Sequence, residues 1–302
     1  MKIYILVFCI LMQSTACKDS NVIKDQKPQS SITTEHLLQD YNQRIINAAK
    51  QKSFEEIRDL YDQESLLMPD YNPQIVNDKN IKIYYDTIFS RQDLKTYRRK
   101  TVDIIEFKNL IIEIGLFTKT FENSENLEGK YFNVWRKHGE EKLILRAEAF
   151  GYLKPIDNPL PFIVPTASKY DSKTISIPRE LEAYISLSKD NVRARMPERT
   201  ADSYTGDGMY LPFADTIKTG KNVLIAHYKN YYQYPATIDS IKLKTYALDL
   251  VEDGYINYGG FYVDWTVPGF SGTTEGTGIS YWRREKDHSL RIHRQIGLHM
   301  YK

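Results

Sequence analysis

The apolar residues near the start of the chain recur at helical spacing. Between residues 35 and 50 they fall every three or four positions, which places them on one face of a helix. Glu56 follows Ser53 by three residues, the pattern of a capping box, and predicts a short second helix that ends near Asp62. A strand is expected at residues 66–69, and the spacing of apolar residues between Ile81 and Phe89 predicts a third helix.

Long strands are predicted after these helices. Their segments are separated by turns that contain Asn, Gly or Glu, and they cover residues 95–107, 110–122, 130–137 and 142–153. Helices followed by a run of strands are typical of an α+β fold, in which a curved, mostly antiparallel sheet wraps around the helices.

The same order of elements is predicted a second time. Helices are expected at residues 178–195, near Ala201 and at 221–232, with a short strand at 209–213. Pro178 suits an early helical position because its missing amide proton costs nothing there. Four strands follow, at residues 238–250, 255–267, 274–284 and 290–300.

Three short matches in the same order indicate that these two series are copies of one unit. The segment from Tyr61 to a proline at 69 matches that from Tyr204 to a proline at 212, at an offset of 143 residues. Gly115 matches Gly260 at 145, and the Trp-Arg pair at Trp135 matches that at Trp282 at 147. Small loop insertions account for the drift, so we expect one domain at residues 35–153 and another at 176–302.

Prolines mark the segment between these domains. Four of them fall within residues 154–175, and proline suits neither a helix interior nor a central strand. This segment is predicted to be a linker, and its apolar residues indicate that it lies against a domain.

The first residues have the pattern of an export signal. Lys2 precedes an apolar run from Ile3 to Met12, and small residues lead to Cys17. The run is shorter than the roughly 20 residues that a membrane-spanning helix needs. Ser14-Thr15-Ala16-Cys17 resembles a bacterial lipobox, although Ser14 replaces the usual leucine. We expect a signal peptide at 1–16, a lipid on Cys17 and a flexible tether at 17–34, which places the chain in the cell envelope as a periplasmic or surface-exposed lipoprotein. The alternative is an ordinary cleaved signal, with Cys17 as an incidental thiol.

Each repeat resembles the NTF2-like superfamily, close to its SnoaL-like and DUF4440-type members. The residues that carry the resemblance are the Tyr61 and Tyr204 segments and the strands at Trp135 and Trp282. It implies two cone-shaped domains, each with three N-terminal helices, a curved sheet and a pocket at its open end. It also implies pairing through the sheets, either between the two domains of one chain or between two chains.

The last strand of the second repeat offers candidate chemistry. Strict alternation places Leu290, Ile292, Ile296 and Leu298 on one inward face, together with Arg294. A buried guanidinium needs a partner, and Asp264 on a neighbouring strand is the candidate. Tyr228 on the third helix and Trp282 complete a predicted polar pocket for an anionic or carbonyl ligand. The alternative is a structural ion pair or an exposed arginine at a strand end, with Trp282 packed in the sheet.

Three functions remain open from the sequence. The first is binding of a small molecule or a protein partner. The second, implied by ketosteroid isomerase and cyclase relatives, is catalysis as an isomerase, cyclase, lyase or hydrolase, with Asp264 as base and Tyr228 as hydrogen-bond donor. The third is a scaffold whose pockets are filled. The first repeat has no matching carboxylate at residues 116–120 of its corresponding strand, so at most one of the two domains is expected to be catalytic. We rank a binding or assembly role above catalysis.

Several classes of function are disfavoured. A net charge of +2 gives no strong field for nucleic acid. His288, His293 and His299 lack metal-binding spacing with carboxylates, so no metal is expected. No phosphate-binding loop, dinucleotide fingerprint or nucleophile elbow occurs, so no cofactor is expected.

Overall fold

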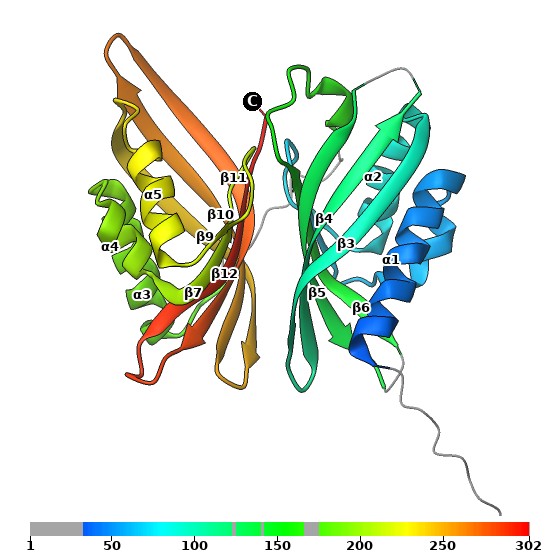
Figure 1. The fold of residues 1–302 in the computed structure, drawn as a ribbon, viewed down its shortest axis with the longest axis horizontal. Coiled ribbons are helices and arrows are strands. Elements are labelled where there is room, and N and C mark those ends of the chain that lie inside the picture. Colours follow the sequence, from blue (N-terminus) through cyan, green and yellow to red (C-terminus); the bar gives the residue numbers. More distant parts are fainter. Residues whose placement is uncertain (1–32, 123–124, 140–141, 166–174, 302) are drawn as a thin grey trace, which may run out of the picture.

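The computed structural model describes residues 33–122, 125–139, 142–165 and 175–301. It is an α+β structure with two six-stranded sheets in the middle and helices on both outer sides (Figure 1). The expected signal peptide, Cys17 and nearly all of the tether lie outside the described residues, as do residues 166–174 of the linker.

The first half contains two α-helices, a 3-10 helix and six strands. The helices are α1 (Thr34–Gln51), η1 (Phe54–Leu60) and α2 (Asp78–Arg91). The strands are β1 (Leu66–Pro69), β2 (Ile75–Val76), β3 (Leu94–Glu106), β4 (Leu110–Phe121), β5 (Leu127–Lys137) and β6 (Leu143–Tyr152). Every helix and strand predicted here is present within a few residues, but the second helix is 3-10 and β2 was not predicted.

The second half follows the same order. Its helices are α3 (Arg179–Arg193), α4 (Pro197–Asp202) and α5 (Lys221–Tyr231). Its strands are β7 (Tyr204–Leu211), β8 (Lys218–Thr219), β9 (Thr237–Val251), β10 (Gly254–Val267), β11 (Phe270–Arg284) and β12 (Leu290–His299). Strand β7 begins five residues before the predicted start at Met209.

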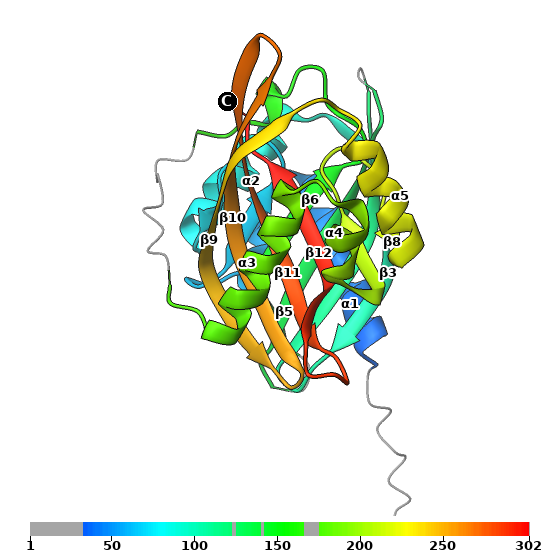
Figure 2. The same cartoon turned by 90° about the vertical axis from the view of Figure 1, so that its left-hand side faces the viewer.

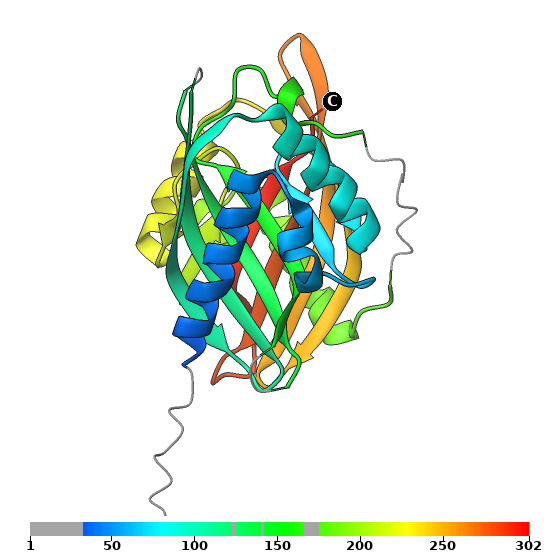
Figure 3. The same cartoon turned by 90° about the vertical axis from the view of Figure 1, so that its right-hand side faces the viewer.

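The two sheets have equivalent strand orders, β2-β1-β6-β5-β4-β3 and β8-β7-β12-β11-β10-β9. Pairing is antiparallel throughout except where β1 meets β6 and β7 meets β12. Helices α3, α4 and α5 cover the outer side of one sheet (Figure 2), and α1 and α2 cover the outer side of the other (Figure 3). We call the side of each sheet that its helices cover the helix-facing side.

The opposite sides of the sheets pack against each other. One apolar cluster joins residues of both halves, among them Ile112, Phe132 and Ala149 of the first with Ile256 and Ile296 of the second. Burying these side chains is a large stabilising contribution, roughly 25 cal/mol for each Å² of apolar surface removed from water.

A β-bulge at the same place in each sheet divides the last strand. The pairing shifts between Val134 and Trp135 in the first sheet and between Tyr281 and Trp282 in the second. As a result Leu290 and Ile292 face the helices, whereas Ile296 and Leu298 face the other sheet. The expectation of a single inward face for these four residues is wrong, because the extra residue of a bulge reverses the alternation.

The described part of the linker packs on the first half. Phe162 and Ile163 contact its core, and Val164 is buried there. Asn72 holds this segment, since its amide donates to the Phe162 carbonyl and its oxygen accepts from the Val164 amide. Within the described residues no helix is both long and apolar enough to cross a membrane.

Candidate functional site

A cavity of about 670 Å³ lies between α3 and the helix-facing side of the second sheet. Helix α3 contributes Ile185 and Ser186, and the sheet contributes residues of β9, β10, β11 and β12. Leu181 is the only α3 residue that is fully buried, so the helix covers the sheet without filling the space beneath it. This volume falls within the range of about 300–1,000 Å³ typical of small-molecule sites.

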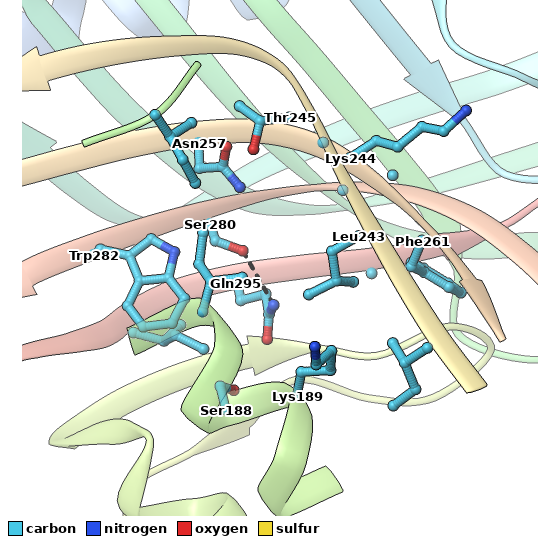
Figure 4. A pocket seen from close by; sticks show the side chains of 18 of the residues that line it. Ser188, Lys189, Leu243, Lys244, Thr245, Asn257, Phe261, Ser280, Trp282 and Gln295 are labelled. Atoms are coloured by element: carbon cyan, nitrogen blue, oxygen red, sulfur yellow. Dashed lines mark hydrogen bonds between the residues drawn. The ribbon is translucent and has the colours of Figure 1, made fainter. Parts of the chain in front are cut away.

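The sheet side of the cavity is lined by polar, uncharged side chains. They come from four adjacent strands and are Thr245, Asn257, Ser280, Trp282 and Gln295. Figure 4 shows Ser280, Gln295 and Trp282 together on one side of this space, with Ser188 and Lys189 of α3 across from them. Gln295 Nε2 donates to Ser280 Oγ at 3.0 Å, which fixes the orientation of the amide.

On the helix-facing side of the sheet, two buried polar atoms in this lining have no hydrogen-bond partner among the described residues. They are the indole Nε1 of Trp282 and the amide Oδ1 of Asn257. An unsatisfied buried polar group costs about 1–3 kcal/mol, so each such group in a native structure calls for an explanation. One is a donor and the other an acceptor, which is the lining that a ligand with complementary groups would complete.

The equivalent space in the first half is almost completely filled. Only about 20 Å³ remains, beside Arg99, Lys119 and Glu148. Here Trp135, which corresponds to Trp282, donates from Nε1 to Glu113 Oε2 at 2.9 Å. Glu113 also accepts from the side chains of Asn42, Thr101, Tyr131 and Asn133.

Strand register explains the difference between the two halves. Glu113 pairs with Asn133 as Asn257 pairs with Ser280, so Asn257 takes the place of Glu113. By the same pairing Gln295 replaces Glu148. Exchanging these two carboxylates for amides removes the charges around which the first half is organised.

The second half also lacks the bulky groups that fill the first. Through the same register Gly278 replaces Tyr131, and Leu243 replaces Arg99. A Cβ on Gly278 would lie 2.3 Å from the carbonyl oxygen of Ile296, so this backbone requires glycine there. The missing tyrosine ring and guanidinium leave the cavity open. By the same register, Gly115 of β4 is equivalent to Gly259 of β10, which is one residue before Gly260, its match in the sequence comparison.

The two tyrosines behind Gln295 are neutral hydrogen-bonding groups. Tyr204 donates to Gln295 Oε1, and its hydroxyl lies 3.0 Å from that of Tyr228. Burial raises the pKa of both phenols well above the ordinary value, so both keep their protons. Tyr228 therefore supports the lining through Tyr204 and does not itself line the cavity.

Of the predicted site residues, Trp282 lines the cavity and Arg294 does not. The bulge turns Arg294 toward the first half, where its Nε donates to Asp103 Oδ2 at 2.6 Å. Asp264 was the expected partner, but it lies on the other side of β10 from Phe261 and accepts from Ser240 Oγ at 2.7 Å. The partners of Arg294 and Asp264 on β11, Tyr281 and Thr273, are eight residues apart, roughly 26 Å. The structure thus does not bring Arg294, Asp264 and Tyr228 together.

Two buried carboxylates of the first half were not predicted from the sequence. Glu113 stands within an isoleucine-rich strand and Glu148 beside two alanines on β6, so a charge in an apolar strand was the available signal. Glu148 accepts from Tyr61 and Tyr85, each at 2.6 Å, and lies 3.7 Å from buried Arg99. Residues 116–120 contain neither carboxylate, because Glu113 lies earlier on the same strand and Glu148 lies on β6.

Within the described residues no group of three or more His, Cys, Asp or Glu side chains could hold a metal ion. The charged residues along the cavity are Glu182, Lys189, Lys242 and Lys244, none of which belongs to the uncharged group on its sheet side. The cavity can therefore offer hydrogen bonds and apolar contact from the sheet, with Glu182 and Lys189 of α3 on the other side.

Comparisons with known proteins find likeness at the level of structure. The chain is similar to a ketosteroid isomerase-like protein from Erwinia carotovora atroseptica, with a TM-score of 0.37 and 12% identity over 41% of this chain and 96% of that one. It is also similar to an NTF2-like protein with a cystatin-like fold from Novosphingobium aromaticivorans, with a TM-score of 0.33 and 13% identity over 40% of this chain and 80% of that one. No protein-family model matches the sequence, and no curated protein matches it.

Proposed function

We propose that this chain is an exported, lipid-anchored protein with two NTF2-like domains, of which the second binds a small uncharged molecule. The observation that carries the proposal is the 670 Å³ cavity in which Trp282 Nε1 and Asn257 Oδ1 are buried without partners. A ligand that supplies one acceptor and one donor there would satisfy both groups.

The first half serves as a scaffold in this proposal. Its counterpart space holds Glu113, Glu148 and Arg99 in an internal network, and about 20 Å³ is left. The filled-pocket alternative thus suits this counterpart space of the first half, and ligand binding suits the cavity of the second.

The lining supports binding over acid–base catalysis. On the helix-facing side of the sheet, the polar side chains that line the cavity are amides, hydroxyls and an indole, none of which exchanges a proton readily near neutral pH. Asp264, the base of the enzyme alternative, is not part of the lining.

Ligand capture tests the proposal directly. The full chain is purified from cells that export it, and native mass spectrometry is used to look for a co-purifying small molecule. Asn257→Phe places a ring in the cavity and removes the unpaired oxygen, so the bound mass should disappear while thermal stability is kept or raised. Asn126→Phe makes the same exchange at an exposed loop position and should retain the ligand. If Asn257→Phe and Asn126→Phe retained the ligand equally, the 670 Å³ cavity of the second half would be ruled out as the binding site.

The lipid anchor is tested separately. In cells fed a radiolabelled fatty acid, the wild-type chain should carry the label and sediment with membranes. Cys17→Ser should carry no label. Labelling that persists in this variant would disprove attachment at Cys17.

A further inference from the structure

A second compartment of about 470 Å³ continues the same side of the second sheet. Its walls are aromatic, and include Tyr231, Tyr232, Tyr234 and Trp265. Phe261 lines both this aromatic compartment and the polar cavity, so the two spaces share a wall. Alternation along β10 puts Asn257, Phe261, Val263 and Trp265 on one side in succession.

The aromatic compartment offers apolar surface without free charge. Arg195 reaches it, but its guanidinium donates to the backbone carbonyls of Tyr232, Tyr234 and Ala236. Burial lowers the pKa of His299 to about 4, so its ring is neutral at pH 7. The indole of Trp265 donates to Thr274 Oγ1 at 3.0 Å. What remains for a ligand is the faces of rings.

The equivalent place in the first half is lined differently, because charged side chains such as Glu122, Glu125 and Lys154 border the space of about 740 Å³ there. Lys119 takes the position of Val263, and Phe162 of the linker packs on Tyr152 with ring centroids 5.5 Å apart. In the second half the ring of Phe213 stacks on His299, the counterpart of Tyr152, with ring centroids 4.1 Å apart. Tyr231 and Tyr234 keep 62% and 63% of their surface exposed, so the compartment is open to solvent.

We propose that the ligand is an uncharged amphiphile, with its polar end at Asn257 and Trp282 and its apolar tail running past Phe261 into the aromatic compartment. This inference rests on the proposed function and adds the class of ligand. The two ends are six residues apart along β10, from Asn257 to Val263, or roughly 20 Å. A ligand that occupied only the polar cavity would be much shorter than this distance.

A chain-length series tests the inference. The probes are 1-monoacylglycerols with acyl chains of four to fourteen carbons, each kept below its micelle concentration and titrated into the purified full chain by calorimetry. Each methylene that leaves water should tighten binding about fourfold, until the tail reaches the end of the compartment.

Two variants separate the two spaces. Val263→Trp fills the aromatic compartment, so the gain with chain length should vanish while the four-carbon probe binds as in the wild type. Asn257→Phe should weaken every probe at least tenfold. Val102→Trp, at an exposed position of β3, is the matched control and should leave the series unchanged. Ile238→Trp is the second variant if Val263→Trp does not fold, as judged by circular dichroism.

The outcomes distinguish the inference from the proposed function. Wild-type affinity that does not depend on chain length, or a dependence that survives a folded Val263→Trp, overturns the inference. If the four-carbon probe still binds and Asn257→Phe abolishes that binding, the proposed function stands although the inference about the apolar tail fails. Failure of every probe to bind the wild type also overturns the inference. The proposed function is then tested independently by native mass spectrometry of the co-purified ligand.

Discussion

Glu113 and Asn257 hold equivalent positions on β4 and β10, and their surroundings decide what each one does. Glu113 accepts five side-chain hydrogen bonds in a fully buried site. Asn257 has an unpaired Oδ1 beside a cavity. Glu113 organises a core, and Asn257 lines an open cavity.

The two positions should respond differently to the same truncation. Glu113→Ala leaves several buried donors without an acceptor and should lower the free energy of unfolding by about 4 kcal/mol. Asn257→Ala removes a group that is already unsatisfied and should cost less than about 1 kcal/mol. Urea unfolding followed by circular dichroism measures both. Similar losses for the two variants would contradict this account.

His299 makes the fold sensitive to acid. Burial lowers its pKa from 6.5 to about 4, so between these values the unfolded chain binds a proton that the folded chain does not. Stability from this group is therefore lost as the pH falls from 6.5 toward 4. Between pH 7 and pH 4.5 the wild type should lose about 2 kcal/mol more than His299→Gln. If the free energy of unfolding changed equally with pH in the wild type and in His299→Gln, the His299 ring would not stay neutral in the folded state.

At the scale of single elements, the bulges of β6 and β12 decide which residues meet which neighbours. Before the bulge, the apolar side chains of the last strand pack against the helices. After the bulge, the apolar side chains of the same strand pack against the other sheet. Arg146 and His293 are the extra residues, and the residue after His293 is the arginine that reaches the first half.

Deleting the extra residue of β12 should be far more damaging than replacing it. Without His293 the strand regains strict alternation, so either Ile296 or Ile292 must turn to the wrong side. We expect no soluble, folded protein. His293→Ala keeps the residue count and should cost at most about 2 kcal/mol. A folded deletion variant with a normal melting temperature would disprove the role of the bulge.

At the scale of the whole molecule, the two halves are joined by an apolar core with an ion pair on either side. Arg294 of β12 meets Asp103 of β3, and Arg146 of β6 meets Asp249 of β9 at 3.1 Å. Each pair links the last strand of one half to the first long strand of the other. The arginines are mostly buried, so each depends on its partner from the other half.

Breaking one pair should destabilise the whole chain. Asp103→Ala leaves the Arg294 guanidinium buried without its carboxylate, which should lower the free energy of unfolding by about 3 kcal/mol. In the double variant with Arg294→Ala much of that loss should be recovered, because the unpaired charge is gone. Thermal unfolding should remain a single transition, since both halves share one core. If the loss in the double variant equalled the sum of the losses in the two single variants, Asp103 and Arg294 would not be coupled.

The sequence by itself determined the α+β class and the approximate position of nearly every strand. Hydrophobic periodicity and turn residues are local signals, so they identified β3 to β6 and β9 to β12 to within a few residues. Trp135 and Trp282 do hold equivalent places, opposite Ile111 and Tyr255. Composition and spacing could go no further, because they do not show which atoms meet.

Only the tertiary structure decided the faces, the partners and the open space. One bulge residue in β12 turned Arg294 away from the cavity and toward Asp103, a residue 191 positions earlier in the chain. Whether a pocket is filled depends on side chains from several strands at once, as Glu113, Tyr131 and Arg99 show against Asn257, Gly278 and Leu243. Strand register brings these residues together, and register is set by long-range pairing that no local pattern records.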